Sequence, residues 1–98
     1  MKKRYIVSID GNLTAQEVEN FSAYIKEKQL YWWHWLSNTW LLIDHTEAVN
    51  TQELRDKATR IFGGKSNLVQ EIPQGGAWYG YGPNGPDKNM FKWIKDNW

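Results

Sequence analysis

No cysteine occurs among the 98 residues, so the chain can form neither a disulfide nor a thiolate zinc site. This composition suits a reducing compartment, and we expect a cytoplasmic protein. Long apolar runs are missing as well. After the basic start Met1 to Arg4, the apolar segment from Tyr5 to Ile9 is interrupted by Ser8 and is too short for a signal sequence or a membrane span. We therefore predict no contact with a membrane.

The chain also has no large excess of positive or negative charge. Twelve lysines and arginines face eleven aspartates and glutamates, a formal net charge of +1, so no global field attracts nucleic acid. The glycine-rich stretch 75–85 follows Pro73 and has no Gly-Lys-Ser/Thr sequence, which argues against a phosphate-binding loop. His34 and His45 have no second ligand at a metal-motif spacing. We therefore predict no cofactor and no bound metal.

Aromatic residues are abundant instead. They make up 15% of the chain, and four of the seven tryptophans fall between residues 31 and 45. Large rings remove much surface from water for each residue that is ordered, so a chain of this length can bury an adequate core. We predict one domain over residues 1–98, with a core at 5–72 and an extension at 73–98 packed on that core.

The start of the chain predicts a strand followed by a helix. Residues 5–10 are rich in β-branched and aromatic side chains and run into a turn at Asp10. Thr14 and Glu17 then match a capping box, in which the hydroxyl accepts an early helix N–H and the glutamate reaches back. Apolar residues follow at helical spacing, namely Val18, Phe21 and Ile25. The predicted helix lies near 14–28.

The tryptophan-rich stretch predicts a β-hairpin. Two β-rich runs, near 31–36 and 40–45, flank a turn at Asn38, a residue type that tolerates positive φ. Strict alternation divides the hairpin into two faces. One predicted face carries Tyr31, Trp33, Trp35, Trp40, Leu42 and Asp44, and the other carries Trp32, His34, Leu36, Leu41 and Ile43. Because both faces are apolar, we expect cover or a partner on each side.

The next segment predicts a second helix and a fourth strand. A cap signature at Asn50 precedes a helix near 51–62 that ends at Gly63, and a short strand near 68–72 ends at Pro73. The order strand, helix, strand, strand, helix, strand resembles the α+β ferredoxin-like sandwich. In that fold, two helices cover one face of a four-stranded antiparallel sheet whose first and third strands are central. The alternative keeps these elements but pairs the fourth strand with a neighbouring chain.

The extension combines glycines with aromatic residues. We expect residues 74–86 to form an irregular loop at the edge of the domain with its rings tucked in. Asp87 can cap a last helix. One side of this helix carries Met90, Phe91, Ile94 and Trp98, and a neighbouring stripe carries Lys88, Lys92 and Lys95. An exposed apolar patch of this size is unusual, so we expect residues 77–98 to fold back over the open sheet face.

Function is predicted from the surplus of aromatic residues. Tryptophan and tyrosine are the usual anchors of protein interfaces, and no catalytic motif is present, so we predict a non-enzymatic binding module, an inhibitor or adaptor, with a protein partner. The chain itself is expected to be a monomer or a homodimer. The candidate binding residues are Trp33, Trp35, Trp40, Trp78, Tyr79, Tyr81, Lys88, Lys92 and Lys95.

Two other function classes stay open. Trp33, Trp35 and Trp40 on one face could stack nucleic-acid bases beside the lysines, although we favour burial of these rings. A metal-dependent hydrolase could use Asp10, Asp44 and His45, but adjacent antiparallel strands would place the two aspartates at opposite ends of the sheet. His34 is expected to be a hydrogen-bonded core residue.

Overall fold

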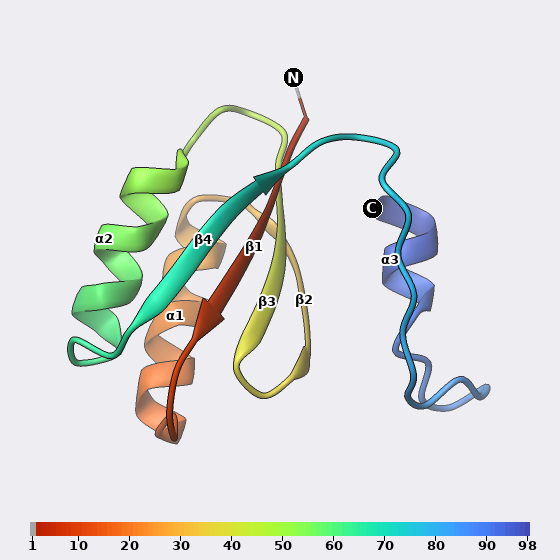
Figure 1. The fold of residues 1–98 in the computed structure, drawn as a ribbon, viewed down its shortest axis with the longest axis horizontal. Coiled ribbons are helices and arrows are strands. Elements are labelled where there is room, and N and C mark those ends of the chain that lie inside the picture. The colour runs from red at the N-terminus through yellow and green to blue at the C-terminus, as the bar shows by residue number, and fades with distance from the viewer. Residues whose placement is uncertain (1) are drawn as a thin grey trace.

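The computed structural model describes residues 2–98 and shows an α+β fold with a four-stranded antiparallel sheet and three helices (Figure 1). The strand order is β2-β3-β1-β4, so β1 and β3 are central. Helices α1 and α2 cover one face, and the C-terminal segment with α3 lies beyond the other (Figure 1). The elements are β1 Lys3–Ile9, α1 Ala15–Glu27, β2 Tyr31–Leu36, β3 Thr39–Asp44, α2 Thr51–Ile61, β4 Asn67–Ile72 and α3 Lys92–Asn97.

Local capping interactions set the ends of the two long helices. Thr14 Oγ1 accepts the Glu17 N–H, and the Glu17 carboxylate accepts the Thr14 N–H, so the predicted capping box is present. The side chain of Asn50 accepts the Glu53 N–H at the start of α2. After α2, Gly63 has a φ of +65°, a conformation that glycine adopts without steric cost. These three predictions are confirmed.

The face assignment of the hairpin is wrong, and a β-bulge is the reason. Leu36 pairs with Thr39 at the turn, but Trp33 pairs with Leu41, so the register shifts by one residue between these two pairs. The extra residue reverses the alternation of β2 relative to β3. Trp33 therefore shares a face with Leu41, whereas Trp40 points to the opposite, helix-covered face. The predicted row of Trp33, Trp35 and Trp40 does not exist.

The helix-covered face holds the main core. Its fully buried side chains include Tyr5, Trp40 and Phe21, and the Phe21 and Trp40 rings meet edge to face with centroids 5.0 Å apart. His34 stacks on Trp40 at 3.8 Å, and its Nε2 lies 3.1 Å from the Ser37 carbonyl oxygen. His34 is only partly buried, so it covers the core edge, which differs from the predicted core position.

The opposite face, which we call the tail face, is covered by residues of the extension. Trp33, 5% exposed, donates from Nε1 to the Met90 carbonyl oxygen at 2.7 Å. Phe91 and Ile94 pack in the same cluster with Leu41. Burial of these side chains on the tail face removes apolar surface from water and holds α3 against the sheet.

The last helix is shorter than predicted. Helix α3 begins at Lys92, and Asp87 does not cap it. Residues before it form a turn instead, with an isolated bridge between Asn84 and Asn89 and a hydrogen bond from the Met90 N–H to the Pro83 carbonyl. Because these backbone groups bond across the turn, they are not available to a helix that starts at residue 87.

The loop before the turn is also different from the prediction. Its two tyrosines, Tyr79 and Tyr81, are 100% and 99% exposed, so their rings are not tucked in. The intervening Gly80 lies so close to the buried Phe91 ring that an added Cβ would be 2.6 Å from it. Glycine is needed here because the backbone packs directly on Phe91, and this packing leaves no room underneath for the tyrosine rings.

Candidate binding surfaces

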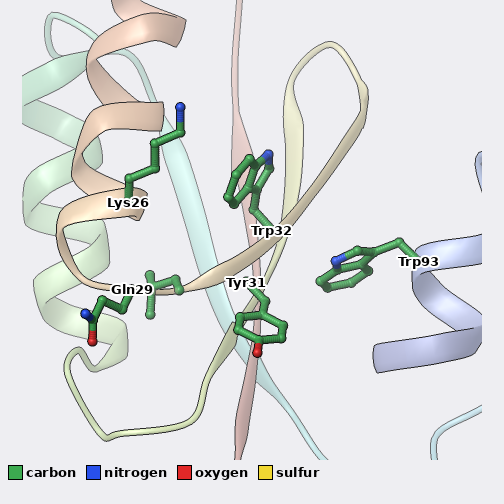
Figure 2. A pocket seen from close by; sticks show the side chains of 6 residues that line it. Lys26, Gln29, Tyr31, Trp32 and Trp93 are labelled. Atoms are coloured by element: carbon green, nitrogen blue, oxygen red, sulfur yellow. The ribbon is translucent and has the colours of Figure 1, made fainter.

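A broad groove of about 690 Å³ runs beside β2. Its walls come from three elements: the end of α1, the start of β2 and helix α3. The lining residues are Lys26, Gln29, Leu30, Tyr31, Trp32 and Trp93. Figure 2 shows the Trp93 ring reaching from α3 towards β2, with Lys26 and Trp32 on the side of α1. Aromatic walls with few polar groups are typical of ligand and peptide sites.

The groove lies at the start of an edge strand, ahead of its β-bulge, where the strand has no protective residue. β2 pairs only with β3, so one of its edges has no strand partner among the described residues. Its sequence, YWWHWL, contains no lysine, acid or proline, the residue types that keep edge strands from pairing with other chains. The other edge strand, β4, carries Glu71 and is followed by Pro73. The two edges are therefore not equivalent.

The groove is lined by one charged side chain, that of Lys26. Lys26 Nζ lies 5.8 Å from the centroid of the Trp32 ring, a cation–π geometry, and the lysine forms no ion pair with any residue in 2–98. Trp32 is 44% exposed and Tyr31 is 50% exposed, and the Tyr31 ring also contacts His45 at 4.7 Å between centroids. The groove thus combines half-exposed rings with one unpaired positive charge.

Tyr79 and Tyr81 form a second exposed surface, which we call the tyrosine ridge. The two residues are separated by one glycine in an irregular extended segment. Gly82, like Gly80, packs closely on the cluster beneath: a Cβ there would lie 2.3 Å from Met90 Sδ. The backbone of the ridge is therefore backed by packed side chains, which reduces the backbone entropy that the segment loses on binding.

The structure separates the other predicted binding residues. Trp40 is fully buried and Trp33 nearly so, whereas Trp35 is 42% exposed at the hairpin. Trp78 is 39% exposed and stacks on Phe91 with centroids 5.9 Å apart. Buried rings present no face to a ligand, so of the three hairpin rings predicted to stack bases only Trp35 is exposed.

The predicted lysines lie on the surface, as their sequence spacing suggests. Lys88 and Lys95 are exposed. Lys92 donates to Asp96 Oδ2 at 2.8 Å, and this hydrogen bond raises the pKa of Lys92 above its ordinary value. Exposed pairs of this kind contribute little to stability.

The acidic residues considered for catalysis lie apart. The register pairs Lys3 with Asp44 at one end of the central strands and Ser8 with Thr39 at the other, so Asp10 and Asp44 are at opposite ends of the sheet, as predicted. Asp44 is buried and accepts three backbone N–H groups, from Thr46, Ala48 and Val49. Across residues 2–98, no group of three or more histidine, cysteine or acidic side chains is placed to hold a metal ion.

The groove was missed in the sequence because its parts come together only in three dimensions. Lys26 and Trp93 are far apart along the chain, and alternation alone cannot say that β2 is an edge strand. One segment of the sequence does point to the groove. Residues 31–34 form part of a predicted strand that contains no charged residue and no proline, as an edge open to pairing would.

Comparison with models of protein families, with curated proteins and with solved structures finds no match for this chain. Within residues 2–98, no helix has the length and apolar character needed to cross a membrane.

Proposed function

We propose that the protein is a non-enzymatic binding module that receives an extended segment of a partner protein along β2. The observation that carries this proposal is the start of the edge strand β2, which lies ahead of the bulge, has no charged residue or proline and lines an aromatic groove. An extended peptide can add to such an edge through backbone hydrogen bonds, while alternate side chains enter pockets beside it.

The composition of the groove indicates the partner's chemistry. Tyr31, Trp32 and Trp93 offer apolar rings, and Lys26 is the charge among the lining residues. An apolar segment with an acidic side chain complements this surface, because a rim charge steers binding and fixes register. The bulge between Trp33 and Leu36 confines regular pairing to the start of β2, which is where the groove lies.

We also propose that residues 3–72 belong to the ferredoxin-like class and that the protein works in the cytoplasm. The strand order β2-β3-β1-β4, with every neighbouring pair antiparallel, supports the fold class. The absence of cysteine supports the compartment.

The test is affinity capture from a lysate of the source organism, with and without nuclease. Trp32→Ser, which removes a half-exposed groove ring, should abolish capture of a specific protein. The double variant Tyr79→Ser and Tyr81→Ser is the matched control, since it removes two exposed rings outside the groove. Capture that survives Trp32→Ser but is lost in the control would contradict the groove and assign the interface to the tyrosine ridge.

Nuclease treatment distinguishes a protein partner from nucleic acid. We expect the captured protein to survive nuclease and its binding to weaken only modestly with salt, because a single lysine faces the groove. Loss of capture on nuclease treatment, with steep salt dependence on a single-stranded oligonucleotide, would favour the nucleic-acid alternative.

A further inference from the structure

Arg4 is a buried cation that has no acidic partner among residues 2–98. It lies on β1, opposite Ile43 on one neighbouring strand and Ile72 on the other, and it is only 5% exposed. Its Nε is buried and has no hydrogen-bond acceptor within residues 2–98, and Arg4 takes part in none of the ion pairs there. A buried charge without a partner is costly, so this position is unusual.

The acids nearest to Arg4 in the sheet register face the other way. Glu71 lies opposite Tyr5, whose ring is in the core under the helices. Asp44 lies opposite Lys3 and uses its carboxylate on backbone N–H groups. Both acids are therefore on the helix-covered face, while Arg4 points to the tail face.

A second cation adds to the positive field around Arg4. Lys2 donates from Nζ to the Asn97 carbonyl oxygen. Burial, and then the charge of Arg4, lower the pKa of Lys2. The two cations are thus close enough to repel each other, and an anion between the tail and β1 would relieve both.

Arg4 lines a small cleft between the tail and the sheet. The cleft encloses about 240 Å³ and is walled by Trp78, Trp98 and the chain from Pro73 to Gly76. The Trp98 ring centroid is 5.8 Å from Arg4 Cζ. The ring restricts the guanidinium but supplies no acceptor for its N–H groups.

An apolar cavity adjoins this cleft. It encloses about 270 Å³ and shares three walls with the cleft: Gly76, Trp78 and Trp98. Its remaining walls are aliphatic, namely Ile6, Leu41, Ile72, Ala77 and Ile94. A cationic cleft and an apolar cavity with common walls make a site with a place for a charged head and a place for an apolar body.

We propose that this site binds a small monocarboxylic acid with a compact aromatic or short aliphatic body. The carboxylate accepts N–H groups of Arg4, for which the planar guanidinium is well suited. The body lies between Trp78 and Trp98 and enters the cavity beside Ile6. The site is on the tail face, away from the β2 groove, and does not depend on the proposed protein-binding function.

Titration calorimetry of the full chain with benzoate tests the site. Benzamide has the same ring without the charge, and inorganic phosphate has charge without an apolar body, so both should bind at least about tenfold more weakly than benzoate. Benzoate should also shift the indole Nε1–H signals of Trp78 and Trp98 in the NMR spectrum. The absence of saturable benzoate binding, or equal binding of benzamide, would overturn the proposal.

Variants identify the residue responsible. Arg4→Gln should weaken benzoate binding at least about tenfold, while Arg4→Lys should retain part of it. Arg55→Gln is the matched control, because Arg55 is exposed and pairs with Asp56, and this variant should bind benzoate as the unmodified chain does. If Arg4→Gln does not fold, Trp78→Ala provides the second test, since it removes one partly exposed wall of the site. Unchanged binding in the folded variant tested would contradict the assignment.

Discussion

Each face of the sheet buries one charged residue, and the two residues differ in their hydrogen bonding. Asp44 and Arg4 are both buried on the central strands β3 and β1, near the same end of the sheet. Asp44 on the helix face is satisfied by backbone N–H groups of the loop that follows it, at 3.0 to 3.2 Å. Arg4 on the tail face has an unpartnered Nε.

This difference distinguishes a charged residue that stabilises the fold from one that we propose binds a ligand. Asp44 organises the loop before α2, and because it is fully buried its carboxylate is not accessible to an outside ligand. Arg4 has an unpartnered Nε and lines a cleft whose other walls are Trp78, Trp98 and residues 73–76. The buried charge on the helix face is therefore satisfied within the fold, whereas the buried charge on the tail face has the chemistry of a site.

The largest expected effect comes from removing the satisfied charge. Asp44→Ala leaves the N–H groups of Thr46, Ala48 and Val49 without their acceptor and should lower the free energy of unfolding by about 3 kcal/mol. Arg4→Gln should cost far less, or raise stability, because it removes an unpaired charge. Urea denaturation of both variants measures the difference. A greater loss for Arg4→Gln would reverse the comparison.

A smaller effect is expected at the contact that holds the tail. Trp33→Phe removes the hydrogen bond to the Met90 carbonyl and part of the packing, and should cost about 2 kcal/mol. Hydrogen exchange should accelerate at the amides of residues 90–95 before it does in α1. Equal acceleration in both regions would mean that the two faces unfold as one unit.

Disturbing the packing of Gly80 against Phe91, beneath the tyrosine ridge, should have a still smaller effect on stability. Gly80→Ala places a Cβ 2.6 Å from the Phe91 ring, so the segment must move and stability should fall by about 1 to 2 kcal/mol. Gly85→Ala is the control, since the nearest atom to its Cβ would be 3.9 Å away. Thermal unfolding of the pair measures the effect, and equal melting temperatures would show that the ridge is not packed as described.

The smallest expected effects are on the pH dependence of stability. Hydrogen bonds from the Thr14 N–H and from Lys65 lower the pKa of Glu17 in the folded state. Ionised Glu17 therefore stabilises the fold above its unfolded-state pKa, and this stabilisation is lost as the pH falls through the folded-state pKa. The hydrogen bond to Asp96 raises the pKa of Lys92 in the folded state. Protonated Lys92 therefore stabilises the fold below its unfolded-state pKa, and this stabilisation is lost as the pH rises through the folded-state pKa. Glu17→Gln should therefore flatten the acid limb of the stability curve, and Lys92→Met the alkaline limb. Unchanged limbs would mean that neither interaction survives in solution.

Short-range chemistry could be predicted from the sequence, and long-range relations could not. The caps at Thr14 and Asn50 depend on side chains within three residues, so their pattern is visible in the sequence. The elements of residues 3–72 all occur within two residues of their predicted ends. Hydrophobic alternation, in contrast, cannot show a bulge, which reverses the faces of Trp33 and Trp40 without changing composition.

The candidate sites were less accessible to sequence reasoning for the same reason. Arg4 reads as part of a basic N-terminal run, and only the sheet register shows that its side chain turns away from the nearby acids. Tyr79 and Tyr81 were expected to be buried, because the sequence does not show that Gly80 occupies the space below them. In each case a contact between distant segments decides the outcome.

The bulge in β2 also determines where the chain can change length. His34 and Trp35 together lie opposite the single residue Trp40. Deleting one of them would give a regular hairpin in which Trp33 still pairs with Leu41, whereas deleting one residue within β3 would exchange the faces of the residues beyond it. Among evolutionary relatives, gaps of one residue should therefore occur at positions 34–35 and be absent from 40–43. The bulge is the point at which this hairpin can gain or lose a residue and keep the same side chains under the tail.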